Sequence, residues 1–338
     1  MNKTVSIIIP CRNEENYIEK CIVSVINANY PKELVSIFVC DGLSDDKTRM
    51  IVKKLAAQHN NIHLIDNKKQ TTPYALNLGL KASESDVKII LGAHAEIDSN
   101  FIKENVNLLF SQEKIGCTGG VIENVYENET AEIIGAAMSS SFGVGNAHFR
   151  TGNKNGYVDT VAFGAYKKEV FDTIGYFDEE LARNQDDEFN YRLTKYGFKI
   201  YLSDKIKSKY YVRSSYSKLF MQYYQYGYWK VFVNKKHQTI TTIRQLIPMF
   251  FVLFIIIGGG LSVLHPYFLT IYISILLLYT TLTIYFAVRK AINLFKVPFF
   301  SFVIFELHIS YGLGYLIGII NFILFNHKPN KYAKKLTR

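Results

Sequence analysis

The last third of this 338-residue chain holds apolar runs long enough to cross a membrane, and this feature limits the folds open to it. The stretches 246–264 and 267–288 each reach the length of about 20 residues that a helix needs to span the hydrocarbon core. Only His265 and Pro266 separate them, so the two spans form a hairpin. The sequence therefore predicts a soluble head followed by a multi-pass segment in the cell membrane.

A third apolar stretch, 299–325, leaves the membrane topology open. If it crossed fully, the lysine-rich tail after it would lie outside, against the tendency of Lys and Arg to stay on the cytoplasmic side. The stretch either breaks this tendency or dips in and returns as a re-entrant hairpin. It carries Glu306 and His308, and ionisable groups at such depth usually face protein or a polar cavity. Contact with a lipid-linked diphosphate and packing against another helix are alternative roles for them.

The charge of the chain indicates its partner. The net charge is +10, and 14% of the residues are aromatic. Such a composition also suits nucleic-acid binding, but the segregated apolar runs favour anionic lipid headgroups instead. The stretch 207–237 interleaves tyrosine with lysine, which is typical of a membrane interface. We therefore expect a membrane partner and no nucleic acid.

The cysteines and the N-terminus indicate a reducing compartment. No two cysteines form a C-x-x-C pair, so the sequence predicts reduced core thiols without a disulfide framework. They are Cys11, Cys21, Cys40 and Cys117. The N-terminus lacks the apolar length of a signal peptide, so the head is expected in the cytoplasm.

The head alternates apolar strand-like runs with helical patterns. The strand-like runs are 4–9, 34–40, 62–65 and 87–91, and the helical patterns fall at 15–27, 46–59 and 73–82. Strands that are apolar throughout predict a parallel sheet covered by helices on both faces. In such sheets, ligands bind beyond the carboxyl ends of the strands.

Polar residues follow two of these strands directly. The first strand leads into Arg12, Asn13 and Glu14, and the second ends at Asp41 before a new helix. Either loop alone can be a well-capped connection. Together they predict a nucleotide site, because an aspartate there can accept from a base N–H or a ribose hydroxyl while a helix start favours an anion. The chain has no G-x-G-x-x-G and no P-loop, which excludes those two modes of phosphate binding.

Five segments follow one another along the head, namely VSIIIPCRNEENYIEKCIVSV, FVCDGLSDDKT, ALNLGLKAS, FGAYKKEVFDTIGYFDEEL and QDDEFNYRL. In this order they resemble an inverting family 2 glycosyltransferase with a GT-A fold. More narrowly, the chain is similar to the succinoglycan-biosynthesis type, which has a C-terminal membrane segment. The resemblance covers the head from Lys3 to about His237 and implies an α/β fold of the GT-A class, with a mostly parallel sheet and C-terminal transmembrane helices.

The chain divides accordingly into four predicted parts. These are a catalytic domain at 1–205, an amphipathic interface region at 206–243, a transmembrane region at 244–326 and a basic tail at 327–338. The transmembrane region holds two spans plus a third span or a re-entrant hairpin.

The resemblance implies a set of nucleotide-sugar-binding residues. The loop after the first strand would hold ribose and uracil, and Asp41 would bind the base. A basic residue at Lys68 or Lys69 would approach the nucleotide, and Asn77 matches an A-x-N-x-G segment, with helix packing as the alternative. The full set is Pro10, Arg12, Asn13, Glu14, Asp41, Lys69, Asn77 and Ala93.

The fourth strand departs from the family pattern. Members usually end it with D-x-D, which carries the divalent ion that bridges the two phosphates. Here Gly92 takes the first position and His94 the second. His94 and Glu96 are candidate ligands of Mn²⁺ or Mg²⁺, and a histidine favours the softer ion. Alternatively, His94 hydrogen-bonds the diphosphate itself.

A long polar stretch, 139–156, is predicted to lack regular structure, and such loops are usually functional or disordered. In the resembling enzymes this region borders the sugar and acceptor pocket. His148 and Arg150 are candidates for phosphate contact there, with exposed loop charges as the alternative.

The stretch QDDEFNYR, 185–192, holds the candidate catalytic group. Acidic residues in a first helical turn are by themselves typical of a capped N-terminus. Counting back from Arg192 on the family motif assigns Asp186 as the carboxylate that takes the proton from the acceptor hydroxyl. Gln185 takes the position of the family's glutamate. Residues expected near the acceptor or in support are Gln185, Asp187, Arg192, Gln222 and Gln225.

These features imply a membrane-anchored inverting glycosyltransferase. It would move a hexose, with glucose as the leading candidate, from a UDP-sugar to a polyprenyl-diphosphate-linked saccharide on the cytoplasmic face. The product would feed exopolysaccharide or capsule assembly, whose other proteins are candidate partners. One alternative is transfer to a polyprenyl monophosphate. The other is a non-catalytic sugar-nucleotide scaffold, which the missing acid at Gly92 motivates.

Overall fold

The computed structural model describes residues 3–152 and 154–329 and divides into two compact units. The first unit comprises Met1–Val125 and Ala147–Tyr211, and the second comprises Tyr126–Asn146 and Val212–Arg338. Residues 330–338, most of the predicted basic tail, lie outside the described residues. The predicted domain boundaries after residues 205, 243 and 326 stay predictions.

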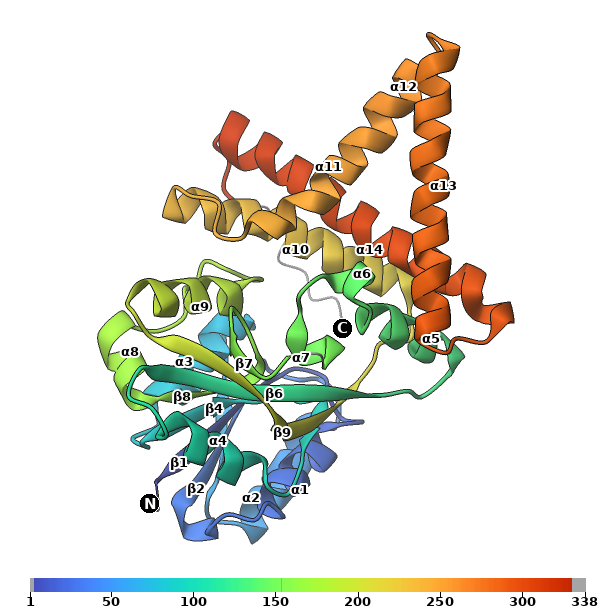
Figure 1. Ribbon diagram of the computed structural model, residues 1–338. Coiled ribbons are helices and arrows are strands. Elements are labelled where there is room, and N and C mark those ends of the chain that lie inside the picture. The colour runs from blue at the N-terminus through green and yellow to red at the C-terminus, as the bar shows by residue number, and fades with distance from the viewer. Residues whose placement is uncertain (1–2, 153, 330–338) are drawn as a thin grey trace. The chain divides into compact units, whose positions relative to one another are not determined.

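The first unit is built on a nine-stranded sheet in which four predicted strands run parallel (Figure 1). They lie in the order β3-β2-β1-β4. Their bounds are β1 Val5–Cys11, β2 Val35–Asp41, β3 Ile62–Asp66 and β4 Val87–Ile90. Ile7 of β1 pairs with Ile37 on one side and with Ile89 on the other. The apolar runs therefore form the interior of a parallel sheet, as the sequence predicts.

The other strands continue the sheet with mixed directions. β8 runs antiparallel to β4, β6 lies next, and β9 runs parallel to β6. Their bounds are β5 Ala95–Ile97, β6 Ile115–Val125, β7 Gly156–Val158, β8 Ala162–Lys167 and β9 Lys199–Tyr211. β9 is not among the predicted elements, because its alternating lysines and tyrosines resemble an amphipathic interface segment in composition.

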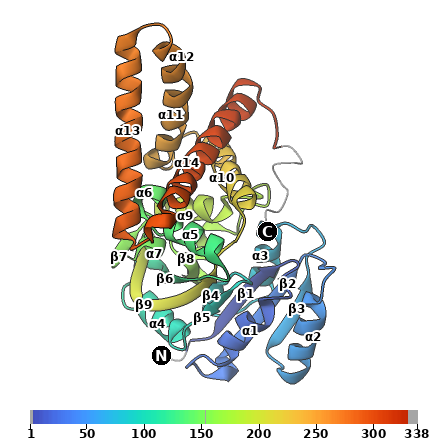
Figure 2. The ribbon, with the colours of Figure 1, turned by 90° about the vertical axis from the view of Figure 1, so that its right-hand side faces the viewer.

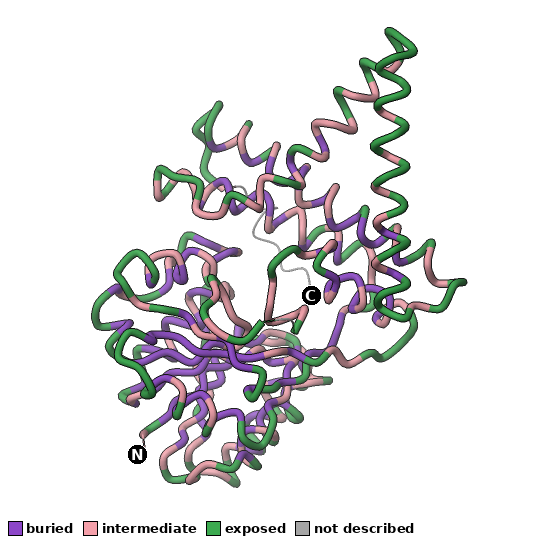
Figure 3. The backbone as a smooth tube through the Cα atoms, viewed as in Figure 1, coloured by how far each residue is buried: buried purple, intermediate pink, exposed green. Residues whose placement is uncertain are grey.

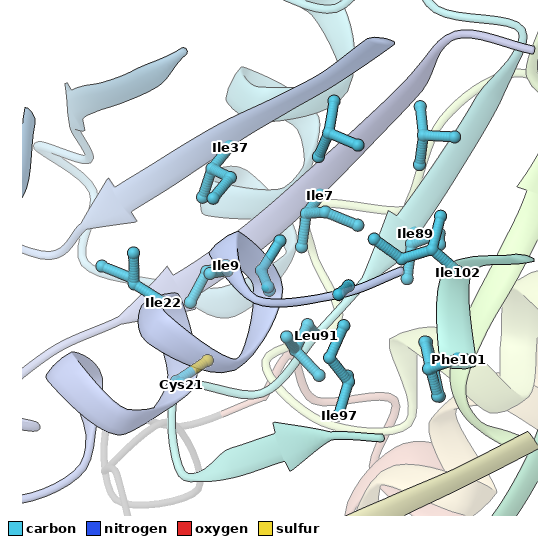
Figure 4. Packing of buried hydrophobic residues seen from close by; sticks show 14 of the residues in the cluster. Ile7, Ile9, Cys21, Ile22, Ile37, Ile89, Leu91, Ile97, Phe101 and Ile102 are labelled. Carbon is cyan, nitrogen blue, oxygen red and sulfur yellow. The ribbon is translucent and has the colours of Figure 1, made fainter. Parts of the chain in front are cut away.

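Helices cover both faces of this sheet, and each face has its own core. Ile7 and Ile9 belong to a core with residues of α1, α2 and α4. The close view shows side chains of α1 and α4 beside the strands (Figure 4). Ile8 points to the other face and packs with α3, α8 and α9. The bounds are α1 Ile18–Ile26, α2 Thr48–Gln58, α3 Thr72–Lys81, α4 Phe101–Leu109, α8 Lys168–Ile174 and α9 Gln185–Lys195. The alternation of side chains along a strand thus builds two cores from one apolar run.

Gly79 brings α3 close to the sheet. A Cβ atom at this position would lie 2.7 Å from Cγ2 of Ile8 and 3.1 Å from Sγ of Cys40. A larger residue would therefore push the helix away from β1 and β2. All four cysteines are buried and free, which confirms the prediction of core thiols.

The second unit is helical and contains the apolar segments (Figure 2). Among the residues that the structure describes, three helical segments are long and apolar enough to cross a membrane, namely Ile243–Ser262, Pro266–Arg289 and Leu294–Leu324. They confirm the three predicted apolar stretches. The elements are α5 Glu129–Met138, α6 Ser141–Val144, α10 Tyr216–His237, α11 Ile247–Leu253, α12 Gly259–Ser262, α13 Pro266–Arg289 and α14 Val297–Gly318. Most residues of α13 are exposed (Figure 3).

The polar stretch 139–156 differs from its prediction. It contains two single-turn helices, α6 and α7 (His148–Thr151), rather than irregular structure alone. Ser140 caps the first of them by accepting from the N–H of Phe142. The stretch is also divided, since its first part belongs to the helical unit and its second part to the sheet unit.

Candidate active site

The two polar loops after β1 and β2 are bound to each other by hydrogen bonds. The N–H of Asn13 donates to Oγ of Ser44 at 2.8 Å, and the N–H of Asp45 donates back to Oδ1 of Asn13 at 3.1 Å. The N–H of Glu14 donates to Oγ1 of Thr48 at 2.8 Å. Asn13 has a φ of 56°, a left-handed conformation that asparagine tolerates better than most residues. The residues predicted to meet at this edge of the sheet therefore do meet.

Asp41 lies fully buried at the tip of β2, inside this pair of loops. Its carboxylate accepts from the N–H of Ser44 at 3.0 Å, from the Ser44 hydroxyl, and from Nη1 of Arg49 at 2.6 Å. A base N–H that binds Asp41 must therefore share the carboxylate with these donors or displace one of them.

Arg49 is a member of this site that the sequence analysis does not identify. Its Nη2 donates to Asp66 at 2.8 Å, so the guanidinium bridges the ends of β2 and β3. The hydrogen bonds with Asp66 and Asp41 raise the pKa of Arg49, and it stays charged. The sequence feature that could have identified Arg49 is its place in the first turn of the helix that follows Asp41, because a side chain there can reach back to the strand tip.

Arg12 lies beside Gly42, at the start of the second loop. A Cβ atom at Gly42 would lie 3.3 Å from both Cβ and Cδ of Arg12. The arginine stem thus packs along the backbone that follows Asp41. Pro10 pairs with Cys40 in the register of β1 and β2, one residue before Asp41. The structure places both residues at the predicted edge, and their roles toward a nucleotide stay predictions.

Asn77 and Lys69 both contact the segment before α9. The Asn77 amide donates to the carbonyl of Phe177 at 2.9 Å and to Glu179 at 3.1 Å, and it accepts from the N–H of Phe177 at 3.0 Å. Lys69 lies 3.4 Å from the Glu179 carboxylate, and its ammonium is 4.2 Å from the ring centroid of Tyr74. Asn77 therefore holds α3 against the 177–179 segment, and its assigned role in nucleotide binding remains a prediction.

His94 pairs with a residue of the first loop. Its Nδ1 lies 3.3 Å from Oε1 of Glu14, and its ring packs edge-on against Tyr210 at 5.3 Å. A Cβ atom at Gly92 would lie 3.7 Å from Nε2 of His94, so an acid at position 92 would stand beside this imidazole. Ala93 between them is buried.

The donor set around His94 does not form a complete metal site of its own. Glu96 accepts a hydrogen bond from the Tyr211 hydroxyl, while His94 is paired with Glu14. Within residues 3–152 and 154–329, no group of three His, Cys, Asp or Glu side chains is placed to hold a metal ion. Two donors, one of them nitrogen, are few for Mg²⁺, which prefers an octahedron of oxygens. The assignment of His94 and Glu96 as ligands of a divalent cation stays a prediction.

Arg150 brings a positive charge to the same neighbourhood. Its guanidinium carbon lies 5.2 Å from the ring centroid of Tyr210, the ring that also contacts His94. Nη1 of Arg150 is buried and has no hydrogen-bond partner in the described part of the chain. A guanidinium offers a fork of donors that matches phosphate oxygens. Arg150 thus brings to the surroundings of His94 a buried donor, Nη1, that the residues described by the structure leave unused.

The three acids at the start of α9 have different surroundings. Glu188 is buried, and it forms a two-point ion pair with Arg192 at 2.6 Å and 2.9 Å. Arg192 also donates to the carbonyl of Ile174, which joins α9 to the end of α8. Arg192 and Glu188 therefore form a structural ion pair within one helix. The predicted position of Arg192 near the acceptor stays a prediction.

Asp186 is exposed at the first turn of α9, and Gln185 and Asp187 are half-buried beside it. Tyr166 of β8 is fully buried, and its pKa is raised by burial and by the charges of Cys117 and Asp186. The Asp186 carboxylate itself keeps contact with solvent. Among the three acids of this turn, its surroundings fit a group that must receive a proton from a bound substrate.

Gln222 and Gln225 belong to the helical unit. Gln222 accepts from Arg213 at 3.1 Å and donates to the Tyr226 hydroxyl at 2.7 Å. Gln225 is buried in the same helix. Their assignment to the acceptor site stays a prediction.

The first unit thus joins a mixed α/β sheet to a hydrogen-bonded loop pair at the carboxyl ends of its parallel strands, as expected of an enzyme that binds a nucleotide there. Residues 6–175 match the sequence model of Glycosyl transferase family 2, and the chain belongs to this family. The family resemblance and the enzyme class that the sequence predicts are both confirmed.

Two relatives show how far the similarity reaches. The chain is 36% identical over 269 residues to the dolichyl N-acetyl-alpha-D-glucosaminyl phosphate 3-beta-D-2,3-diacetamido-2,3-dideoxy-beta-D-glucuronosyltransferase of Methanococcus voltae, covering 77% of this chain and 84% of that protein. It is 28% identical over 254 residues to the succinoglycan biosynthesis protein ExoA of Rhizobium meliloti (strain 1021), covering 72% of this chain and 74% of that protein. Both alignments extend beyond the family match at residues 6–175 in length.

Solved structures agree with the predicted fold class. The mannosyltransferase PcManGT from Pyrobaculum calidifontis, in complex with GDP-Man and Mn²⁺, superposes with a TM-score of 0.65 at 15% identity. That alignment covers 94% of this chain and 88% of PcManGT. S. aureus TarS 1–349 in complex with UDP-GlcNAc superposes with a TM-score of 0.53 at 15% identity, covering 93% of this chain and 90% of that one. At this identity the likeness shows the fold alone.

Proposed function

We propose that this membrane-associated glycosyltransferase transfers a hexose, with glucose as the leading candidate, from a UDP-sugar to a lipid-linked saccharide. The observation that carries the proposal is the buried Asp41 inside the hydrogen-bonded loops after β1 and β2. A preorganised carboxylate at the carboxyl ends of parallel strands suits the base and ribose of a nucleotide. Pro10, Arg12 and Glu14 would complete the contacts to the nucleotide.

In the proposed reaction, Asp186 is the general base. An acceptor hydroxyl oxygen attacks the anomeric carbon from the face opposite the nucleotide, and its proton passes to the Asp186 carboxylate. The bond between the anomeric carbon and the diphosphate oxygen breaks, and UDP leaves with that electron pair. The exposed position of Asp186 at a helix start supports this role, because the group must meet a substrate that comes from outside.

The leaving diphosphate needs positive charge beside it. Arg150 is proposed to meet this need, because its buried Nη1 has no hydrogen-bond partner among the described residues. A divalent cation, Mn²⁺ or Mg²⁺, would supply the same stabilisation if it bound at His94. The incomplete donor set there favours a larger share for the arginine.

The proposed acceptor is a saccharide on a polyprenyl diphosphate at the cytoplasmic face, in exopolysaccharide or capsule assembly, where other assembly proteins are candidate partners. The name of the ExoA relative supports a place in polysaccharide biosynthesis. The name of the Methanococcus voltae relative gives that protein a dolichyl phosphate-linked sugar as acceptor, which supports a lipid-linked sugar here. Transfer to a polyprenyl monophosphate itself is the second candidate.

The test is a screen of labelled UDP-sugars with membrane fractions and native lipid, followed by thin-layer analysis of extracted lipids. Label on a lipid-linked oligosaccharide supports the proposal, and label on a lipid that carries one sugar supports the monophosphate candidate. UDP binding without any lipid product from the full set of donors would identify a non-catalytic scaffold. Each reaction is run with and without EDTA, and loss of transfer with EDTA would support a divalent cation at His94 and Glu96.

A further inference from the structure

The three apolar segments of the helical unit differ in how much protein covers them. Within Leu294–Leu324, half of an apolar 18-residue window is buried, whereas only 11% of such a window is buried in each of the other two segments. A helix that is surrounded by lipid has little protein over its surface, whereas a helix packed against other helices is covered on one side or more. The third segment therefore packs against protein to an extent that the hairpin of α11, α12 and α13 does not.

Its main partner is α10, and the two backbones touch. A Cβ atom at Gly227 of α10 would lie 2.0 Å from the carbonyl oxygen of Tyr311, and one at Gly314 of α14 would lie 2.0 Å from that of Tyr224. Both views show the two helices side by side (Figures 1 and 2). Glycines on both helices thus create a contact that no larger residue permits.

Polar bonds extend this contact toward the end of the segment. Asn234 of α10 donates to the Tyr315 hydroxyl at 2.9 Å. Lys235 donates to the carbonyl of Phe322 at 2.7 Å and to the side chain of Asn326. The third segment therefore cannot enter the bilayer without α10.

The composition of α10 excludes it from the hydrocarbon core. It carries Lys218, Lys230, Lys235 and Lys236 within Tyr216–His237. A lysine at the centre of a spanning helix is strongly unfavourable, and four of them on one helix of this length leave no apolar window. The same pairing that buries α14 therefore keeps it out of the bilayer centre.

We propose that α10 and α14 lie together in the plane of the membrane surface, and that the chain crosses the bilayer only twice. The lipid would meet the outer face of α14 and its continuation. Exposed apolar side chains recur there at a spacing of three residues, as expected for one side of a helix. They are Phe299, Phe302, Phe305, Ile317, Ile320 and Ile323.

The distribution of charge agrees with two crossings. Lys236 and Arg244 precede the hairpin, and Arg289, Lys290 and Lys296 follow it. The turn between the spans carries no lysine or arginine. Two crossings place all of these cations on one side of the membrane, in agreement with the positive-inside tendency. They also place the lysine-rich tail there, which a third crossing would put outside.

The first test measures the side of the membrane on which two engineered thiols lie, and it does not depend on the donor or the acceptor. Leu264→Cys lies at the hairpin turn, where the side chain is exposed, and Lys328→Cys follows the third segment. With a membrane-impermeant maleimide on intact cells, we expect label at position 264 and no label at 328 until the cells are permeabilised. The unsubstituted protein, whose four cysteines are buried, is the background control. Label at position 328 in intact cells would overturn the proposal.

The second test separates an in-plane helix from a re-entrant one. A fluorophore is attached to one engineered thiol at a time, at Phe302→Cys or Ile320→Cys, in vesicles of zwitterionic and anionic lipids. Quenching of the fluorophore by nitroxides reports its depth in the bilayer, and Leu277→Cys in α13 is the deep reference. We expect equal, shallow quenching at 302 and 320 and deep quenching at 277. All three side chains are exposed, and the substitution at Phe302 removes one edge-on ring contact with Tyr216 of α10. Quenching at 302 or 320 as deep as at 277 would contradict the in-plane arrangement.

Discussion

Two regions of the sheet unit place carboxylates at the ends of their elements, yet they use them differently. At the tip of β2, Asp41 is fully buried and accepts hydrogen bonds from Ser44 and Arg49. At the start of α9, Asp186 is exposed, although Glu188 only two residues away is buried and paired with Arg192. A carboxylate that already has fixed donors can position a ligand, whereas one open to solvent can accept a proton. This difference supports the proposal that Asp41 binds the nucleotide and that Asp186 takes the proton.

The largest effect is expected for Asp186→Asn. The variant should lose about 10²–10⁴-fold in transfer rate, the usual contribution of a general base, because an amide cannot take the acceptor proton. Binding of UDP, measured by calorimetry, should be unchanged. The matched control is Asp187→Asn, which should keep most of the activity. If Asp187→Asn shows the greater loss, the assignment of the base moves by one residue.

The next largest effect is a loss of folding stability when the Glu188–Arg192 ion pair is broken. Arg192→Met leaves a buried carboxylate without its partner and should destabilise the protein by about 3–5 kcal/mol. Thermal unfolding in detergent measures this loss. The conservative Arg192→Lys keeps the charge but loses the two-point geometry, and it should give an intermediate value. A stable Arg192→Met variant without transfer activity would instead place Arg192 in the reaction.

A smaller effect is expected at the other region. Asp41→Asn should weaken UDP binding by about 10- to 100-fold, because hydrogen bonds to a charged group contribute about 1.5–3 kcal/mol. Titration calorimetry with UDP checks this value. The control is Asp66→Asn, which removes the exposed partner of Arg49 and should change the affinity little. Equal losses in both variants would show that Arg49, rather than Asp41, carries the affinity.

The smallest effect is expected for Arg150→Gln, which should lower the transfer rate by about tenfold through the loss of one charged hydrogen bond to the diphosphate. UDP affinity and rate are measured on the same preparation. Arg150→Lys should recover part of the rate, because it keeps the charge. The Arg150→Gln variant could instead keep its rate and lose activity in EDTA. That result would show that a metal ion, and not Arg150, stabilises the leaving diphosphate.

Much of the fold could be predicted from local patterns. The apolar runs that became β1 to β4 and the three apolar segments of the helical unit all appear where the sequence places them. The meeting of Asn13 with Ser44 also follows from the sequence, because parallel strands end at one edge. β9 could not be predicted in this way, since its lysines and tyrosines obscure the alternation of buried residues.

The partners of individual side chains were decided by the tertiary structure. Arg49 bridges Asp41 and Asp66, and Asn77 binds a segment 100 residues further along the chain. The length and composition of the third apolar segment are compatible with a membrane span, and its backbone contact with α10 is the observation behind the proposal that it lies at the membrane surface instead. The periodicity of apolar residues predicts local secondary structure, because it depends on residues that are close in the sequence. Burial and pairing depend on which distant segment packs against a residue, and that is settled only when the chain has folded.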